Sequence, residues 1–268
     1  IGALNTDYAL TNEVKNKALS YSYTWTGRKV DVTNRLENLT PDGGMYASAS
    51  DLVKFYSALY YSDKLINDRM KAIMMSGYMD TDRSWSEIVD SPESIRLSYG
   101  GGPGVSAAVE LHLRDRFFVV VLANTDALVA EKISQRITDA FRGNEPKAIQ
   151  LPMSVFANNF LTERGDAAFL SGIESALRAE GYEGLSDRPL NKLGFELLDL
   201  GEQDRAITVF EANCAMFPDR ANTFDSLAYA YAEMGNTDLA VKYYKEALRV
   251  DPSFKSAKDG LKKLTDEN

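Results

Sequence analysis

The sequence has one cysteine and one histidine among 268 residues. Cys214 has no partner for an internal disulfide, and its helical spacing from Phe210 predicts that it packs as a small apolar side chain. His112 alternates with Leu111 and Leu113 onto the polar side of a predicted strand, so we expect a solvated surface histidine. A histidine in that place builds no Ser-His-Asp or Cys-His site. Since the chain also has no Cys/His cluster, we expect no metal and no cofactor.

Basic residues are in deficit as well. The net charge is -9 and the isoelectric point is near 4.8, which argues against a nucleic-acid or anionic-membrane partner. No apolar run is long enough to span a bilayer, so we predict no transmembrane segment. The chain begins with Ile1, and its first residues do not have the pattern of a signal peptide. We expect a piece of a longer protein, with any targeting signal upstream.

The stretch from Ser98 to Leu122 predicts the centre of a sheet. It begins with a glycine-rich run, Ser98 to Gly104, and continues with Val105 to Leu113, where apolar and polar residues alternate as in a half-solvated strand. Phe117 to Leu122 is apolar throughout, which is typical of a strand buried on both faces. The three residues between these two runs predict a hairpin.

Further elements surround this hairpin. Tyr21, Tyr23 and Trp25 alternate as in a strand, with a turn at Gly27 and a second extended piece around Val30 and Val32. Ser48, three residues before Asp51, predicts a helix start, and the expected buried face of that helix is Leu52, Phe55, Tyr56 and Leu59.

The region after that helix is less patterned. Residues 76–94 show no sustained period and predict a surface loop or short strands. A later helix ending at Gly143 is expected to bury its apolar stripe, which comprises Ala130, Ile133, Ile137, Ala140 and Phe141.

The C-terminal part contains an internal repeat of 34 residues. Residues 187–220 align with 221–254, with Leu193 matching Leu227, Gly194 matching Ala228 and Pro218 matching Pro252. This period, with small residues where two helices touch, is the tetratricopeptide repeat pattern. Each such helical hairpin needs a neighbour on its apolar face, so we expect residues 151–179 to cover one side and a helix with Ala257, Leu261 and Leu264 to cover the other.

We therefore predict an α+β fold followed by an all-α solenoid. The expected domains are residues 1–145, an antiparallel sheet with covering helices, then 146–186, a helical connector or cap, and 187–268, two tetratricopeptide repeats with a capping helix.

Four motifs in the first part resemble the C-terminal half of the serine β-lactamase-like family, which includes class C β-lactamases, penicillin-binding proteins and esterases. They are Ile1-Gly2-Ala3-Leu4-Asn5-Thr6, Pro41-Asp42-Gly43-Gly44-Met45-Tyr46-Ala47-Ser48-Ala49-Ser50-Asp51-Leu52, Tyr99-Gly100-Gly101-Gly102-Pro103-Gly104 and Val119-Val120-Val121-Leu122-Ala123-Asn124. They occur in the family's order. The resemblance implies that the first domain is part of a β-lactamase-like serine hydrolase. It also implies a bacterial protein of the periplasm or the secreted fraction.

Such a hydrolase works through an acyl-enzyme on a small-molecule or peptide substrate. Its S-x-x-K and Y-x-N motifs are absent from this sequence, so we expect no catalytic residue in this chain and a nucleophile upstream. The resemblance assigns substrate binding to Tyr99, Gly100, Gly101 and Gly102. Tyr99 stands where the family has Lys or His, and a phenol carries no positive charge near neutral pH, which favours an ester or peptide over a β-lactam. The residues alone allow a plain tight turn for the glycine run.

The repeat domain offers a second candidate surface. The positions expected to line its inner face are Arg188, Asn191, Asn222 and Asp225. Asp225 and Glu233 argue against a clamp for a C-terminal carboxylate, because their negative charges would repel it. The face either packs within the protein or binds a protein or peptide partner. The preferred hypothesis is thus a fragment of a serine hydrolase with a repeat domain, and the alternative is an inactive hydrolase-like domain that serves as a protein-binding module.

Overall fold

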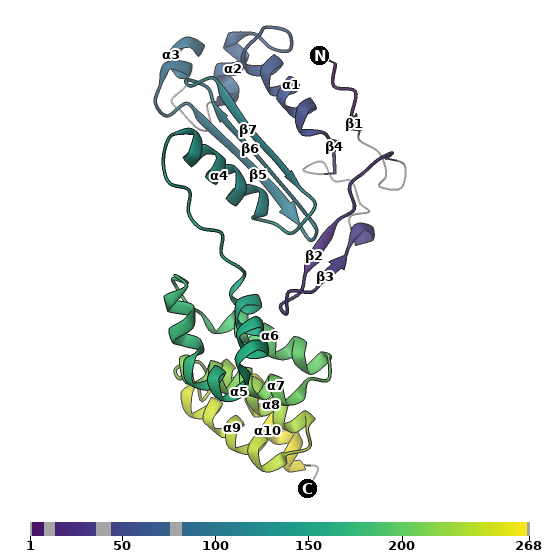
Figure 1. Cartoon of the computed structure of the whole chain (residues 1–268), viewed down its shortest axis with the longest axis vertical. Helices are drawn as coiled ribbons and strands as arrows, with labels where there is room; N and C mark the ends of the chain where they lie inside the picture. The colour runs from purple at the N-terminus through teal and green to yellow at the C-terminus, as the bar shows by residue number, and fades with distance from the viewer. Residues whose placement is uncertain (1, 8–13, 36–43, 76–81, 267–268) are drawn as a thin grey trace. The chain divides into compact units, whose positions relative to one another are not determined.

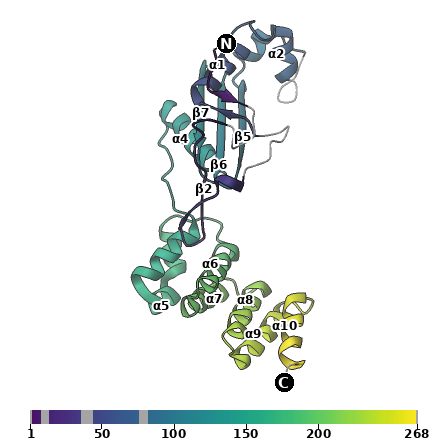
Figure 2. The same cartoon turned by 90° about the vertical axis from the view of Figure 1, so that its right-hand side faces the viewer.

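The computed structural model describes residues 2–7, 14–35, 44–75 and 82–266. The chain divides into two compact units, which we describe separately: unit 1 comprises residues 1–23 and 29–148, and unit 2 comprises residues 24–28 and 149–268. Figures 1 and 2 show a mixed α/β unit 1 with small antiparallel sheets and an all-helical unit 2. Ile1, Pro41 to Gly43 and residues 76–81, on which parts of two motifs and of one predicted loop fall, lie outside the described residues.

The largest sheet of unit 1 has three antiparallel strands in the order β5-β6-β7. Their bounds are β5 Ile95–Gly102, β6 Val105–His112 and β7 Phe117–Ala123. The predicted hairpin between β6 and β7 is present, with His112 paired to Phe117. Gly102 pairs with Val105, so Pro103 and Gly104 alone form the β5-β6 turn, and Gly104 has the positive φ of 77° that such a turn needs.

One face of this sheet carries the apolar core of unit 1. Val109, Leu111 and Leu113 point to this face and are buried against three helices. These are α1 Ala49–Tyr60, α2 Asp68–Met75 and α3 Trp85–Asp90. Ser48 caps α1 as predicted, since its Oγ accepts a hydrogen bond from the Asp51 N–H at 3.1 Å.

The prediction of a loop or short strands for residues 76–94 is wrong over α3. A capping box begins this helix: Ser84 Oγ accepts from the Glu87 N–H while the Glu87 carboxylate accepts from the Ser84 N–H at 2.7 Å. Trp85 and Ile88 are buried on the apolar face of the sheet. The helix is only six residues long, too short for its periodicity to stand out in the sequence.

The opposite face of the sheet is covered by α4, Val129–Phe141, which Figure 1 shows running alongside the strands. Its buried residues are Ala130, Glu131, Ser134 and Thr138. The expectation that the Ile133, Ile137 and Phe141 stripe is buried is therefore wrong, because these side chains are 38%, 46% and 66% exposed. The polar stripe of the helix meets the polar side of β6 instead.

This arrangement also overturns the prediction for His112, which is 2% exposed. The predicted alternation along β6 is confirmed, but α4 covers the polar side of the strand, which the prediction left facing solvent. Phe117–Leu122 was expected to be buried on both faces, and it is not: only Val119 is fully buried and Leu122 is 41% exposed. The strand lies at one end of the sheet order, where fewer neighbours cover it.

Two two-stranded antiparallel sheets complete the strands described in unit 1. In the first, β1 Thr6–Asp7 pairs with β4 Tyr46–Ala47. In the second, β2 Tyr21–Tyr23 pairs with β3 Lys29–Asp31, close to the predicted extended pieces, and the 3-10 turn Thr33–Arg35 follows.

Unit 2 consists of helical hairpins stacked in succession, as Figure 2 shows. Its helices are α5 Met153–Ala179, α6 Asp187–Asp199, α7 Gln203–Met216, α8 Ala221–Glu233, α9 Thr237–Val250 and α10 Lys255–Asp266. The pairs α6-α7 and α8-α9 coincide with the two 34-residue repeats. Gly165, with φ 75° and ψ 174°, breaks α5 into two helical pieces.

The core of unit 2 runs through all of these hairpins. Phe169, Leu193 and Phe210 are fully buried in one cluster that joins α5 to the first repeat. A second cluster places Ala257 of α10 against Ala228 and Tyr244 of the second repeat. Both covering elements expected from the sequence thus pack against the repeats. Cys214 is buried in the first cluster, which confirms its predicted packing role.

Residues 24–28 form a turn within unit 2. The Thr26 backbone N–H donates to Glu196 Oε2 at 3.0 Å, and Thr26 Oγ1 donates to Glu196 Oε1 at 2.9 Å. The Thr26 carbonyl accepts from Asn158 Nδ2 at 3.1 Å. Among the described residues of both units, no helix is long and apolar enough to cross a bilayer.

Candidate functional site

The glycine-rich run predicted to bind substrate lies on β5. Packing explains why position 101 is a glycine. A Cβ there would come within 2.9 Å of the Val105 carbonyl oxygen and 3.1 Å of Ala127 Cα. Gly104 is equally confined, because its Cβ would lie 2.4 Å from Val32 Cγ2. Gly100 and Gly102 face open space. Close backbone packing therefore accounts for two of these glycines without a ligand.

Tyr99 points to the α4 side of the sheet. Its phenol is directed to Glu110 on the neighbouring strand, with 3.2 Å between Tyr99 OH and Glu110 Oε1, and the residue is 41% exposed. Burial of the phenol, together with the nearby Glu110 charge, raises the pKa of Tyr99. The side chain is thus a neutral hydrogen-bond donor, engaged within the sheet.

Glu110 is the hub of a buried polar network that sequence reasoning missed. It is 3% exposed, and α4 supplies two donors: Ser134 Oγ to Glu110 Oε1, and Thr138 Oγ1 to Oε2 at 2.7 Å. His112 Nε2 lies 3.4 Å from Oε2, and Arg142 donates to His112 Nδ1 at 3.0 Å. The sequence does contain a signal, because Ala130, Ser134, Thr138 and Arg142 recur every four residues along one side of α4.

The protonation states in this network follow from its contacts. Burial disfavours the ionised form of Glu110, but hydrogen bonds from Ser134, Thr138, His112 and Tyr99 together lower its pKa. Burial lowers the pKa of His112, and the Arg142 charge acts in the same direction against the opposing effect of Glu110. His112 is thus a neutral imidazole. Since Glu110, His112 and Ser134 are all nearly inaccessible, the network holds β6 to α4 and offers no open nucleophile.

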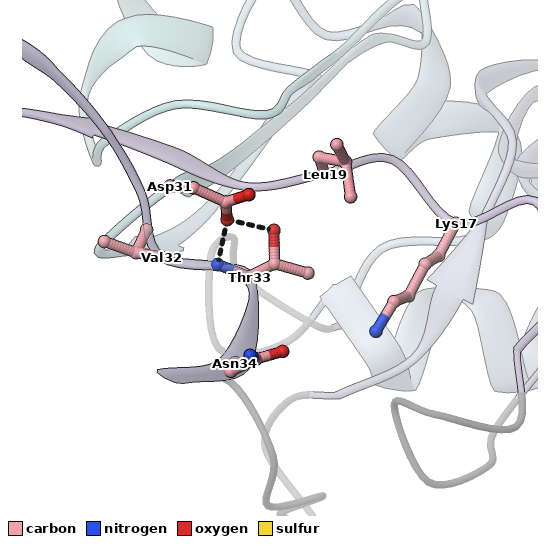
Figure 3. Close-up of a pocket in the computed structure, with 6 residues that line it drawn as sticks. All are labelled: Lys17, Leu19, Asp31, Val32, Thr33 and Asn34. Carbon is pink, nitrogen blue, oxygen red and sulfur yellow. Dashed lines mark hydrogen bonds between the residues drawn. The ribbon is translucent and has the colours of Figure 1, made fainter.

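Unit 1 also has a surface pocket, shown in Figure 3, which is lined by residues 17, 19 and 31–34 and by no residue of the Glu110 network. Its polar lining is largely occupied by internal bonds: Asp31 Oδ1 accepts from the Thr33 N–H at 2.9 Å and from Thr33 Oγ1 at 2.6 Å. It contains none of the residues predicted to bind substrate. Its lining consists of Lys17, Leu19, Asp31, Val32, Thr33 and Asn34.

In unit 2, the first helices of the two repeats lie side by side. Asn222 Nδ2 of α8 donates to Asp187 Oδ2 of α6 at 3.3 Å, and the rings of Phe195 and Tyr229 lie 5.8 Å apart between the same two helices. The repeat places Asn191 in the same row as Asp225. We call this surface the first-helix face; it comprises Arg188, Asn191, Phe195, Asp199, Asn222, Asp225, Tyr229 and Glu233.

The four residues predicted from the repeat pattern occupy different environments on this face. Arg188 is exposed, while Asn191 and Asn222 are half-buried. Asp225 is 9% exposed, and burial raises the pKa of its carboxyl, with a hydrogen bond from Ser256 opposing that effect. The buried oxygens Asn191 Oδ1 and Asp225 Oδ1 receive no hydrogen bond. The helices around these two buried oxygens therefore leave both without a donor.

Sequence reasoning named Glu233 only for its charge and missed Tyr229 and Asp199. Tyr229 is 42% exposed between the two helices. Burial and the adjacent Glu233 and Asp199 charges raise the pKa of the Tyr229 phenol. The available signal was the four-residue spacing, which puts Asn191, Phe195 and Asp199 in one row of α6 and Asp225, Tyr229 and Glu233 in one row of α8.

Comparison with known proteins identifies the repeat. The model of the tetratricopeptide repeat family matches residues 226–254. The chain is also 32% identical over 76 residues to "Protein CTR9 homolog" of Arabidopsis thaliana, an alignment that covers 28% of this chain and 7% of that protein. The chain thus spans a small part of the length of this curated relative. Within the described ranges, no group of three or more His, Cys, Asp or Glu side chains is arranged to hold a metal.

Proposed function

We propose that unit 2 is a protein-interaction module that binds an extended segment of a partner on the first-helix face. The observation that carries this proposal is the stacking of α6 and α8, which aligns equivalent positions of the two repeats in a continuous strip of polar and aromatic side chains. The exposed Tyr229 and Arg188 side chains of this strip are groups that a bound peptide can contact. Packing within a larger protein remains the competing role for this face.

The test uses the whole 268-residue chain and a library of immobilised octapeptides. We expect a subset of peptides to retain the chain, and Tyr229→Ala to abolish their retention, because the substitution removes the exposed ring at the centre of the face. The control is Lys245→Ala, an exposed position on α9 in the second-helix layer. If no peptide is retained, or if both variants behave alike, the proposed module is wrong.

We propose as a second function that unit 1 is part of a β-lactamase-like serine hydrolase domain whose nucleophile lies upstream. Contact between the first and second motifs supports this proposal. Asp51 of the second motif accepts from the Asn5 N–H at 2.6 Å and lies 3.2 Å from Thr6 Oγ1, so it bonds to the first motif.

Two further features agree with this second proposal. The Tyr99 to Gly102 run lies on β5, at one end of the sheet order, where the family places its pocket-lining box. The exposed Ile133, Ile137 and Phe141 stripe of α4 is an apolar surface that a further part of the domain would cover.

Covalent labelling tests the hydrolase proposal. The 268-residue chain should not react with a fluorophosphonate or a fluorescent penicillin, whereas the full-length protein should, because only an activated serine forms the adduct. A full-length protein that lacks Ser-x-x-Lys and Tyr-x-Asn upstream, or that does not label, would leave unit 1 without a catalytic role.

A further inference from the structure

The first-helix face contains a concentrated negative surface around Tyr229, which we call the Tyr229 cluster. It comprises Asp199, Asp225, Tyr229 and Glu233. Asp199 lies one turn beyond Phe195 on α6, and Glu233 lies one turn beyond Tyr229 on α8. The centroids of the Phe195 and Tyr229 rings lie 5.8 Å apart, and the charges of Asp199 and Glu233 both act on the exposed phenol. The aromatic ring and the two acids therefore form a single surface.

The charge of this cluster is not neutralised by neighbouring side chains. Helix α8 contains no lysine or arginine, and in the part of the chain that the structure describes none of the three carboxylates forms an ion pair within 4.0 Å. Asp199 and Glu233 are exposed. A mobile counter-ion or a bound cationic group must therefore balance their charge.

A third carboxylate of the cluster, Asp225, is buried and not fully hydrogen-bonded. It lies one turn before Tyr229 on α8, is more than nine-tenths buried, and leaves Oδ1 without a donor. An ionised carboxylate in such a place costs folding free energy, and a nearby positive charge would reduce that cost.

The aromatic ring and the carboxylates together indicate which chemical class of ligand this surface would bind. The face of an exposed aromatic ring attracts a cation, with a free energy of about 0.5–1 kcal/mol at exposed sites. Two flanking carboxylates add charge attraction and accept hydrogen bonds from an ammonium or guanidinium group. An acidic segment would be repelled, and an aliphatic side chain would desolvate the carboxylates without compensation.

We propose that the Tyr229 cluster binds a lysine or arginine side chain of the partner segment, so that unit 2 selects basic peptides. This inference rests on the proposed interaction function and specifies the chemical class of its partner. The aromatic ring packs on the aliphatic stem or the charged head of the basic residue, and Asp199 and Glu233 receive its N–H groups.

The experiment uses the whole chain and pools of octapeptides that share one fixed central residue: lysine, arginine, glutamine, leucine or glutamate. We expect the lysine and arginine pools to bind about tenfold more tightly than the glutamine pool in 0.15 M salt. The double variant Asp199→Asn/Glu233→Gln should lose this preference. The matched control, Asp204→Asn/Asp238→Asn, makes the same charge change at the exposed starts of α7 and α9 and should keep it.

The possible results separate the two claims. If pools bind through the first-helix face but glutamate or leucine is preferred, the basic-peptide inference is wrong and the interaction module stands. If both double variants reduce lysine binding equally, the attraction arises from overall charge, and the Tyr229 cluster has no selective role. If no pool binds, the interaction module itself fails. Far-UV circular dichroism of each variant confirms that loss of binding is not loss of folding.

Discussion

The packing of α6 on α7 makes a direct prediction about Gly194. A Cβ built at this position would lie 2.6 Å from Cε1 and Cζ of Phe210, where ordinary contacts are 3.4 Å or longer. Phe210 is fully buried, and its ring is also held edge-on by Phe195 at 5.2 Å, so it has little room to move. We expect Gly194→Ala to force the two helices apart.

The size of the effect follows from two opposing contributions. Overpacking a well-filled core costs about 1–3 kcal/mol. Alanine in place of glycine within a helix returns up to about 1 kcal/mol through its higher helix propensity. The net loss in the free energy of unfolding of unit 2 should therefore be about 1–2 kcal/mol, which lowers its Tm by several degrees.

The matched control is Gly172→Ala in α5, where the nearest atom to the added Cβ is Phe160 Cζ at 3.8 Å. This substitution makes only an ordinary van der Waals contact in the same unit, so we expect a gain of about 0.5–1 kcal/mol. Differential scanning calorimetry of the whole chain gives both values, and hydrogen exchange in α6 and α7 assigns the change to unit 2. Equal stabilisation by the two alanines would refute the close contact between these helices.

Three further predictions concern titratable groups. The pKa values of His112 and Glu110 are both lowered in the folded state, so the unfolded state takes up protons first as the pH falls. Unit 1 should therefore lose stability below about pH 6.5 and again below about pH 4.3. In urea titrations, Glu110→Gln should reduce the second loss, while other carboxylates with lowered pKa values, such as Asp51 and Asp126, keep part of it. Burial raises the pKa of the Cys214 thiol to about 12, so iodoacetamide at pH 8 should alkylate it only after unfolding. Because burial raises the pKa of Asp225, its ionisation opposes folding at neutral pH; Asp225→Asn should raise the Tm of unit 2 at pH 7.5, with a smaller gain at pH 4.

The two helical hairpins of unit 2 could be predicted because their sequence pattern occurs twice. Each of the two hairpins uses the same small and apolar positions, such as Gly194 and Ala228, and a period of 34 residues is visible without any knowledge of tertiary contacts. The alternation along β6 was equally readable, since period two is imposed by the strand itself. Local geometry thus fixed these predictions.

The polar contact between β6 and α4 could not be read from hydrophobicity. An apolar stripe normally marks the buried side of a helix, but α4 buries Ser134 and Thr138 and leaves Ile137 exposed. The decisive fact is that Glu110 and His112 face the helix, and this pairing joins residues more than 20 positions apart. Tertiary contact overrode the local pattern.

The candidate site on unit 2 was half predicted for a related reason. The repeat pattern predicted that Arg188, Asn191, Asn222 and Asp225 lie on one face. It does not predict which carboxylates lie around an exposed aromatic ring. Tyr229 became conspicuous only when its exposure and its contact with Phe195 were known.

The most direct test of the account is site-specific photocrosslinking of the whole chain to the lysine-centred peptide pool. The crosslinker p-benzoylphenylalanine is placed at position 188 on the first-helix face or at position 245 on α9, both exposed. We predict a peptide adduct from position 188 that falls with Asp199→Asn/Glu233→Gln, and little adduct from position 245. Equal adducts from both positions, or an adduct at 188 that the double substitution leaves unchanged, would contradict the binding of a basic segment on this face.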